Sequence, residues 1–178
     1  MPRLFVAIDL PGHVKAALSG FAAELPVARW VGAEELHLTL RFIGEVDQES
    51  CSAIKSALSA ISFSAFPLTL CGVGHFPPGR HPRVLWVGME PCEGLMQLQQ
   101  DVELALMEVG IAVDERPFSP HITLARLKET VPVAVTAFEN RHAEFACPSF
   151  EVGELILYSS ILTRQGAIHT REAIYRCR

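Results

Sequence analysis

The sequence predicts an α+β fold with mostly antiparallel sheets and flanking helices, and three observations support this prediction. Segments with strand periodicity and helix periodicity interleave along the 178 residues. Two late strands, 150–162 and 167–177, are separated only by the short turn TRQG, which joins antiparallel neighbours. The core His-x-Thr-Leu occurs twice, within ELHLTLRF at 35–42 and within PFSPHITLAR at 117–126. Because each half of the chain holds one copy, we expect two similar lobes, related by a pseudo-two-fold axis, around a central cleft.

Four elements are expected in the first part of the chain. The apolar run RLFVAIDL at 3–10 predicts a buried strand that a Pro-Gly pair ends. Apolar residues at helical spacing predict a helix over 13–25, which the following proline ends. Alternation in ELHLTLRFIG predicts a strand over 35–44. Asp47 is then the expected N-cap of a helix that continues to about residue 61.

Five further elements precede the late strand pair. Two strands, 67–76 and 83–90, are joined by the Pro/Gly-rich loop PPGRHP. Apolar residues at helical spacing predict a helix over 93–110 that closes on a glycine. The segment HITLARL at 121–127 predicts a strand, and 132–140 predicts a helix whose β-branched residues lower its helical propensity.

The composition excludes several classes of protein. With 49% hydrophobic and 20% charged residues, the chain is expected to form an ordinary globular domain or two small lobes that share a core. A formal net charge of −5 argues against a protein that coats nucleic acid with a broad basic surface. Residues 116–178 nevertheless hold more basic than acidic residues, which suits one local anionic group.

Cysteine usage and hydropathy indicate the compartment. The five cysteines are odd in number and form no CxxC pair, so we expect reduced thiols in a cytoplasmic protein and neither a disulfide framework nor a zinc site. The apolar start is broken by Asp9, which leaves it too short for a signal peptide. No apolar run approaches 18 residues, so no membrane span is expected.

The repeated motif places polar side chains in pairs. Side chains alternate between the two faces of a strand, so His37 and Thr39 share one face, as do His121 and Thr123. The apolar residues of each motif then anchor the opposite face in their lobe. If the two motifs face each other across a cleft, two imidazoles and two hydroxyls surround a single point.

Such a constellation suits phosphodiester hydrolysis. Two imidazoles with pKa values of about 6.5 can act as acid and base. Two hydroxyls can hold the non-bridging oxygens of a phosphate. One histidine would take the proton from water and the other would protonate the leaving alkoxide, with no metal and no covalent intermediate. The spacing of the residues leaves open which histidine plays which part.

Structural interpretations of the same residues compete with this one. A strand histidine commonly has a purely structural role, and threonine favours strands in any case. Other chemistries lack their motifs, since the chain has no HExxH, GxSxG or P-loop, and Ser119 beside His121 does not by itself make a nucleophile–base pair. The remaining histidines are expected on the surface or in loops, namely His13, His75, His81, His142 and His169.

At these residues the chain resembles the 2H phosphoesterases, which are named for two H-x-[ST]-x motifs. Within them it is similar to the RNA 2′,3′-cyclic phosphodiesterase branch, also called bacterial 2′-5′ RNA ligase, of the LigT or ThpR type. The resemblance covers nearly the whole chain. It rests on RLFVAIDLP, LHLTLRFIGEV, GHFPPGRHPRVLWVG, FSPHITLAR and LYSSIL.

The resemblance implies a fold and a reaction. The fold would be one bilobal domain over 1–178, with each lobe contributing one HxTL strand to the cleft. The reaction would be hydrolysis of 2′,3′-cyclic phosphate ends of RNA to 2′-phosphomonoesters, without a metal or any other cofactor. His37 would be the proton donor to the departing 3′-oxygen and His121 the base that activates water. Thr39 and Thr123 would hold the phosphate oxygens.

The resemblance also implies contacts to the terminal nucleotide from Arg126 and Phe5, by stacking on its base. Strict alternation places Arg126 on the opposite face from His121, so it reaches the cleft only if the strand bulges, twists or ends near Ala125. Arg41 shares a face with His37 by the same alternation and is a rival cationic contact. Members of the family often carry an aromatic residue after the final turn, near the position of His169.

Three alternatives remain open at this stage. The same site would suit a 2′-5′ phosphodiesterase or the 2′-5′ ligation for which the family is also named. A non-catalytic module that binds RNA ends, or a scaffold protein, would have no need for two histidines. We expect a monomer whose partners are RNA ends or small cyclic nucleotides. The loop residues Arg80, His81 and Arg83, which Phe76 and Trp86 flank, are candidate contacts to a longer RNA, while Trp86 itself is expected in the core.

Overall fold

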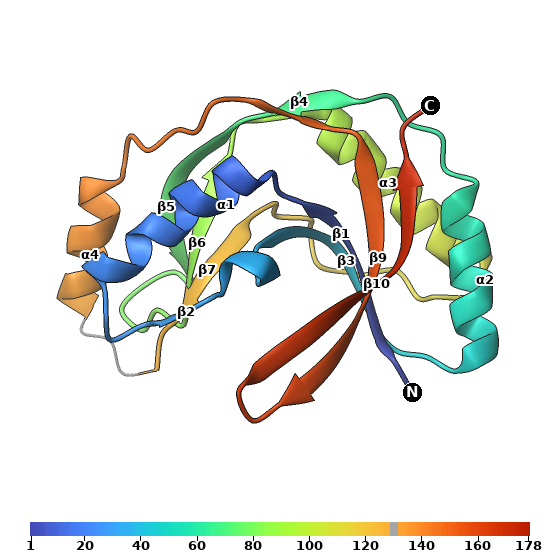
Figure 1. Cartoon of the computed structure of the whole chain (residues 1–178), viewed down its shortest axis with the longest axis horizontal. Helices are drawn as coiled ribbons and strands as arrows, with labels where there is room; N and C mark the ends of the chain where they lie inside the picture. Colours follow the sequence, from blue (N-terminus) through green and yellow to red (C-terminus); the bar gives the residue numbers. More distant parts are fainter. Residues whose placement is uncertain (129–131) are drawn as a thin grey trace.

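The computed structural model describes residues 1–128 and 132–178, in which strands form two four-stranded sheets and one two-stranded sheet (Figure 1). The strands are β1 Arg3–Asp9, β2 Arg29–Trp30, β3 His37–Glu45, β4 Phe66–Leu68, β5 Leu70–Phe76, β6 Val84–Met89, β7 Ile122–Arg126, β8 Phe150–Val152, β9 Glu154–Thr163 and β10 Gly166–Arg176. The α-helices are α1 Gly12–Ser19, α2 Gln48–Ser59, α3 Glu93–Glu108 and α4 Pro132–Arg141, and the 3-10 helices are η1 Gly20–Glu24 and η2 Ala33–Glu35. The strands pair antiparallel in all three sheets of the described residues, which confirms the predicted α+β class.

The two four-stranded sheets share a three-strand order. The first sheet has the order β10-β9-β1-β3 and the second has β2-β7-β6-β5, so β9-β1-β3 corresponds to β5-β6-β7. In both sets the third strand carries an HxTL motif at or next to its first residue. The repeated order supports the predicted pseudo-two-fold relation between the halves.

The helices connect the two sheets. Helices α2 and α3 lie beside the first sheet, while α1 and α4 lie beside the second (Figure 1). Because α1 follows β1 and α3 follows β6, the helix after each middle strand crosses to the other sheet. One continuous hydrophobic cluster includes residues of both sheets and of all four helices.

Strand β1 is buried on both faces. Leu4, Val6 and Ile8 belong to the main core. Phe5 and Ala7, on the other face, pack with residues of β9 in a small second cluster. This double burial explains why the segment is a continuous apolar run and does not alternate.

Both motif strands bulge at the same place. The register of β3 against β1 skips Leu40, and the register of β7 against β6 skips Leu124, which is the leucine that ends each HxTL core. As a result two consecutive residues are buried in each strand, Leu40 with Arg41 and Leu124 with Ala125. A bulge inserts one residue, so residues beyond it face the side opposite to that given by strict alternation.

Several boundaries differ from the prediction. The expected strand 67–76 is divided into β4 and β5, and the expected strand 150–162 into β8 and β9, because β4 and β8 pair with each other in a separate sheet. The expected helix 13–25 changes from α1 to the 3-10 helix η1. Strand β2 has only two residues and depends on a distant partner, so it was missed.

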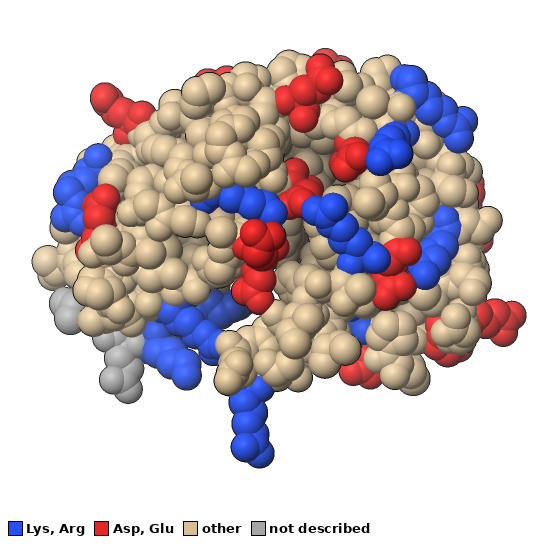
Figure 2. All heavy atoms as spheres, viewed as in Figure 1, with Lys and Arg blue, Asp and Glu red and all other residues tan. Residues whose placement is uncertain are grey.

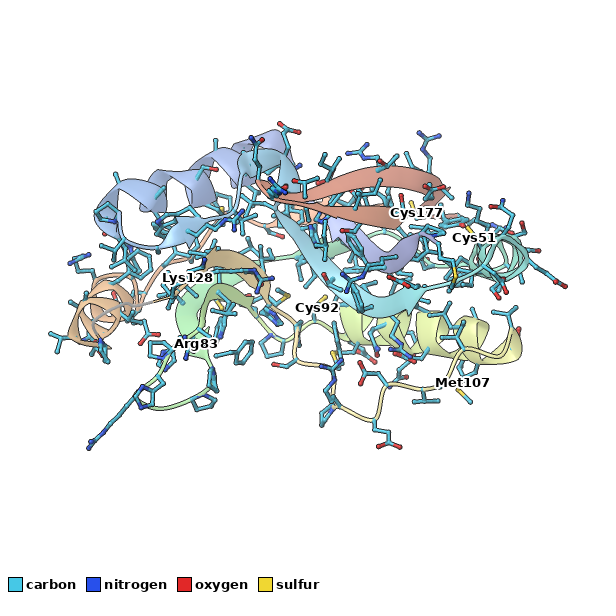
Figure 3. All side chains as sticks on the ribbon, turned by 90° about the horizontal axis from the view of Figure 1, so that it is seen from below. Cys51, Arg83, Cys92, Met107, Lys128 and Cys177 are labelled. Atoms are coloured by element: carbon cyan, nitrogen blue, oxygen red, sulfur yellow. The ribbon has the colours of Figure 1, made fainter. Side chains whose placement is uncertain are left out.

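The five cysteines are free, and the labelled ones lie on or beside three different elements, α2, α3 and β10 (Figure 3). No helix in the described part of the chain has the length and apolar character needed to cross a membrane.

Candidate active site

A cleft of about 550 Å³ lies between the two four-stranded sheets and is lined by both motifs. His37 and Thr39 reach it from β3 in the first sheet. His121 and Thr123 reach it from the start of β7 in the second sheet. The structure therefore brings together the four side chains that strand alternation predicted to meet.

The two imidazoles are oriented in the same way. The Nδ1 atom of His37 lies 2.6 Å from the carbonyl oxygen of Glu35, and that of His121 lies 2.8 Å from the carbonyl oxygen of Ser119. A carbonyl oxygen only accepts hydrogen bonds, so Nδ1 carries the proton in both rings. Nε2 is then the nitrogen left for proton transfer in each case.

His37 is enclosed by other rings. The ring centroid of Phe5 lies 4.9 Å from it, and that of His169 lies 5.3 Å away in an edge-on arrangement. Burial is the main reason that the pKa of His37 is lowered to about 4. The hydrogen bond to the carbonyl of Glu35 raises this pKa, and the charge of His169 lowers it further.

Charged groups behind His37 have opposing effects on its pKa. Asp9 is the cross-strand neighbour of His37 and raises the pKa, while Lys15 lowers it. Lys15 Nζ lies 2.8 Å from Asp9 Oδ1, and the other carboxylate oxygen of Asp9 accepts a hydrogen bond from Arg171. Because two cations neutralise Asp9, its charge offsets little of the effect of burial on His37.

His121 lies beside a different set of aromatic residues. The ring of Phe76 approaches it edge-on, with centroids 4.9 Å apart, and Phe76 also contacts Trp86 at 5.3 Å. The expectation that Trp86 is a core residue is wrong. Its neighbours in β6 are buried, whereas the half-buried indole lies on the opposite face of the strand. The indole packs against Gly74, and a Cβ added to Gly74 would come within 2.4 Å of the ring.

The bulges bring two further side chains into the cleft. Arg126 and Phe42 each lie five residues after the histidine of their motif, and both line the cleft. Strict alternation would place both on the opposite face, but the skipped leucine before each reverses their direction. Arg126 therefore reaches the cleft because β7 bulges just before it, which is one of the conditions stated from the sequence. Phe42 was missed, although it is 44% exposed and occupies the corresponding position in the first motif.

Arg41 is not a cleft residue, contrary to the alternation argument. The same bulge turns it into the core, where it is 9% exposed. Its Nε atom lies 2.9 Å from Glu103, in a geometry too poorly aligned for a hydrogen bond, and its Nη1 atom lies 3.5 Å from Asp114. Its Nη2 atom donates to the carbonyl oxygen of Ala112. Arg41 thus holds the segment after α3 against β3.

Phe5 lines the cleft but presents little surface to it. The residue is 3% exposed, with Tyr158 stacked at 5.1 Å and His37 at 4.9 Å. Its ring is therefore occupied by protein contacts, and the exposed aromatic surface of this region belongs to Phe42. Base stacking by Phe5 stays a prediction that its burial does not favour.

His169 was expected on the surface or in a loop, but it is a strand residue that lines the cleft. It lies on β10, half-buried, and lines the cleft beside His37 and Phe5. Burial lowers its pKa. Sequence alone placed His169 near a family aromatic position but gave no reason to bring it beside His37.

The other histidines lie outside this cleft. His13 and His81 are exposed, as expected. His75 contacts Glu139 at 2.5 Å and His142 contacts Glu24 at 2.8 Å, so these two half-buried rings attach the α4 region to β5 and to η1.

The PPGRHP loop stands apart from the cleft as well. Arg83 Nη1 donates to the carbonyl oxygen of Lys128 at 3.3 Å, and both residues lie at the same end of the molecule (Figure 3). Arg80 and His81 are exposed. Contact between this loop and a longer RNA stays a prediction.

Within residues 1–128 and 132–178, no three His, Cys, Asp or Glu side chains cluster in a way that would hold a metal ion.

Comparison with known proteins gives a consistent match. The model of the 2′-5′ RNA ligase superfamily matches residues 13–162. An RNA 2′,3′-cyclic phosphodiesterase of Thermotoga maritima is 34% identical over 183 residues, which cover 98% of this chain and 94% of that protein. One of Geobacillus stearothermophilus is 34% identical over 161 residues and 86% of this chain, which spans about half (51%) of that protein.

A solved structure has the same fold. The structure of Escherichia coli LigT in complex with 3′-AMP is similar to this chain with a TM-score of 0.79. The two sequences are 31% identical, and the match covers 99% of each chain.

Proposed function

This chain belongs to the 2′-5′ RNA ligase superfamily of 2H phosphoesterases, and we propose that it hydrolyses 2′,3′-cyclic phosphate ends of RNA to 2′-phosphomonoesters. The observation that carries the proposal is the pair of histidines, each with Nδ1 bound to a backbone carbonyl and both lining one cleft. Relatives named for this activity, over nearly the full chain in the Thermotoga maritima case, support it.

The proposed reaction uses one nitrogen of each ring. Nε2 of neutral His121 accepts a proton from water as the water oxygen bonds to phosphorus, opposite the ribose 3′-oxygen. The bond from phosphorus to the 3′-oxygen breaks, and Nε2 of protonated His37 gives its proton to that oxygen. One proton is taken up and one is released by the protein, so the product is a 2′-phosphomonoester with a free 3′-hydroxyl. This division of roles follows the family resemblance.

Thr39 and Thr123 flank the reacting centre from the two sheets. Each hydroxyl can donate one hydrogen bond to a non-bridging phosphate oxygen. Because the two donors come from opposite walls, they would hold the phosphorus between the two imidazoles and keep the attacking and leaving oxygens in line.

The lowered pKa of His37 bears on its role as proton donor. With a pKa of about 4, His37 is neutral in the free protein at neutral pH. A phosphate anion in the cleft favours the charged imidazolium and so raises this pKa when substrate binds. Substrate binding and protonation of His37 are therefore coupled in the proposed mechanism.

The terminal nucleotide would lie between Arg126 and Phe42. The guanidinium comes from one sheet and the exposed ring from the other, and both line the cleft next to the motifs. A base held between a cation and an aromatic ring gains stacking and cation–π energy without a sequence-specific hydrogen bond. The complex of the related LigT with 3′-AMP supports a nucleotide-sized ligand in this family.

We also propose that the protein acts in the cytoplasm as a monomer.

The identity of the product tests the function. An RNA oligonucleotide with a 2′,3′-cyclic phosphate end and a 2′-5′-linked dinucleotide are incubated separately with the protein, and the products are resolved by chromatography and mass. We expect a gain of one water and a 2′-phosphate on the first substrate, and much slower cleavage of the second. Preferred cleavage of the 2′-5′ linkage, or a joined product when a 5′-hydroxyl RNA is added, would favour the alternative activities. Binding without turnover would identify a non-catalytic module.

A further inference from the structure

The outer part of the cleft has a different character from the catalytic part. Arg3 of β1 and Arg29 of β2 line it, together with residues of the β9–β10 hairpin such as Leu162 and Gly166. The proposed proton transfers use neither arginine. Arg3 comes from the first sheet and Arg29 from the second, so the two guanidinium groups approach the same space from opposite walls.

These arginines have no carboxylate partner within ion-pair distance among the described residues. Arg29 Nη2 donates to the carbonyl oxygen of Gln165 at 2.7 Å, and the Arg3 guanidinium lies over the ring of Phe42, 5.5 Å from its centroid. Glu45 is the cross-strand neighbour of Arg3 but makes no such pair with it. Five other arginines do pair with carboxylates, namely Arg41, Arg116, Arg141, Arg171 and Arg176.

The local charge is thus opposite to that of the whole chain. The protein carries a net charge of −5, yet among the residues that the structure describes the cleft is lined by three arginines, Arg3, Arg29 and Arg126, and one carboxylate, Glu35. Arg29 and Arg126 are direct neighbours in the β2–β7 pairing, where like charges repel. Lys and Arg atoms gather around a hollow between the β9–β10 hairpin and the part of the second sheet that holds β2 and β7 (Figure 2). An anion bound here would relieve this repulsion.

We propose that Arg3 and Arg29 form a second phosphate subsite, which binds the phosphodiester on the 5′ side of the terminal nucleotide. Guanidinium groups bind phosphate oxygens through paired, charge-assisted hydrogen bonds. In an RNA end whose cyclic phosphate lies between the histidines and whose base lies between Arg126 and Phe42, this phosphodiester is the next anion along the chain. The protein therefore prefers oligonucleotide ends to a nucleoside 2′,3′-cyclic phosphate. This inference rests on the proposed function and names its substrate class.

The test compares three substrates of increasing length. They are adenosine 2′,3′-cyclic phosphate, the same nucleoside with a 5′-phosphate, and the dinucleotide ApA with a 2′,3′-cyclic phosphate. The quantity measured is the ratio of kcat/KM for each longer substrate to that for the nucleoside. For wild type we expect a ratio of about ten or more for the dinucleotide, which falls as the salt concentration rises. A free 5′-phosphate that gives the same gain as the dinucleotide would assign the subsite to a terminal phosphate and overturn the phosphodiester assignment.

Substitutions then locate the subsite. Arg3→Gln and Arg29→Gln should each reduce the dinucleotide ratio several-fold, and the double variant should bring it close to one and remove its salt dependence. Arg164→Gln is the matched control, because Arg164 is an exposed hairpin arginine that does not line the cleft. Since Arg29 also holds the hairpin through Gln165, Arg3→Gln is the decisive variant.

Two results would overturn the subsite. One is a wild-type ratio close to one, and the other is an unchanged ratio in Arg3→Gln, whatever the result for Arg29→Gln. A general loss on all three substrates with an unchanged ratio assigns the arginines a structural role and also overturns it. Failure of the proposed function looks different, because wild type would then not hydrolyse even the nucleoside cyclic phosphate, which does not reach the subsite.

Discussion

His37 and His121 make the same hydrogen bond from two different sheets: each Nδ1 donates to the carbonyl oxygen two residues earlier, at 2.6 Å for Glu35 and 2.8 Å for Ser119. Because this bond joins residues only two positions apart, it depends on the local backbone of each motif and not on the packing around either lobe. It fixes the tautomer and leaves Nε2 for proton transfer in both rings. Their surroundings differ, since His37 is enclosed by Phe5 and His169 while His121 meets the edge of Phe76. The same motif thus provides two groups that can take different roles.

The pH dependence of kcat/KM should be bell-shaped, because one histidine must be neutral and the other charged. The pair is active when it holds one proton, so the acid limb should lie near the lower of its two pKa values. The pKa of His37 in the free protein is about 4, which places this limb near pH 4. In the kcat profile the limb that belongs to His37 should move to higher pH, because bound phosphate raises that pKa. Stopped assays in buffers of constant ionic strength would measure both profiles. A flat kcat/KM profile between pH 3 and pH 9 would contradict the assignment.

Replacing His169 should shift the acid limb. The charge of His169 lowers the pKa of His37, so His169→Gln should raise that pKa and move the limb of kcat/KM to higher pH. His13→Gln is the control, since His13 is exposed and is not among the residues that line the cleft. An unmoved limb in His169→Gln would show that the two rings do not interact electrostatically.

The burial of His37 should make stability depend on pH in a defined window. The unfolded chain binds a proton at this residue with a pKa of 6.5, whereas the folded chain does so only near 4. The unfolded state therefore holds more protons between these values, and the free energy of unfolding should fall as the pH drops from about 6.5 to about 4, by about 3 kcal/mol at most. Urea denaturation of wild type and His37→Gln at pH 7 and pH 4.5 measures this. Equal losses in both proteins would place the pH dependence elsewhere.

Arg41 and Arg126 should separate stability from nucleotide binding. Arg41→Ala leaves the partly buried Glu103 without its cation, although Asp114 keeps Arg116, and should cost about 3 kcal/mol of unfolding free energy. Arg126→Ala removes an exposed side chain and should leave stability nearly unchanged while raising KM for a cyclic nucleotide about tenfold. Thermal denaturation and steady-state kinetics on both variants test the contrast. The reverse pattern would mean that Arg41, as strict alternation suggested, is the nucleotide contact.

The outcome for these two arginines shows what the sequence can and cannot reveal. Alternation correctly gave the shared faces of His37 with Thr39 and of His121 with Thr123, because these pairs precede the bulges. It failed for Arg41 and Phe42, which follow the bulge in β3. A bulge depends on the register against a strand distant in sequence, so short-range periodicity does not contain it.

Other parts of the site depended on long-range packing in the same way. His169 reaches the cleft because β10 lies beside β9 in the first sheet, and β2 exists because two residues pair with β7. Trp86 was placed in the core because its strand is apolar, but Gly74 on the neighbouring strand leaves room for the indole on the other face. The order of the elements, by contrast, followed from local periodicity and turn residues.

The most direct test of the paired-histidine account is turnover of adenosine 2′,3′-cyclic phosphate in the presence of EDTA by wild type, His37→Ala and His121→Ala, with His13→Ala as control. The account predicts that wild type and His13→Ala are unaffected by the chelator, and that each cleft variant loses at least about 10²–10⁴-fold in kcat while its fold is retained by circular dichroism. Loss of wild-type activity in EDTA, or an active double variant that lacks both cleft histidines, would contradict it.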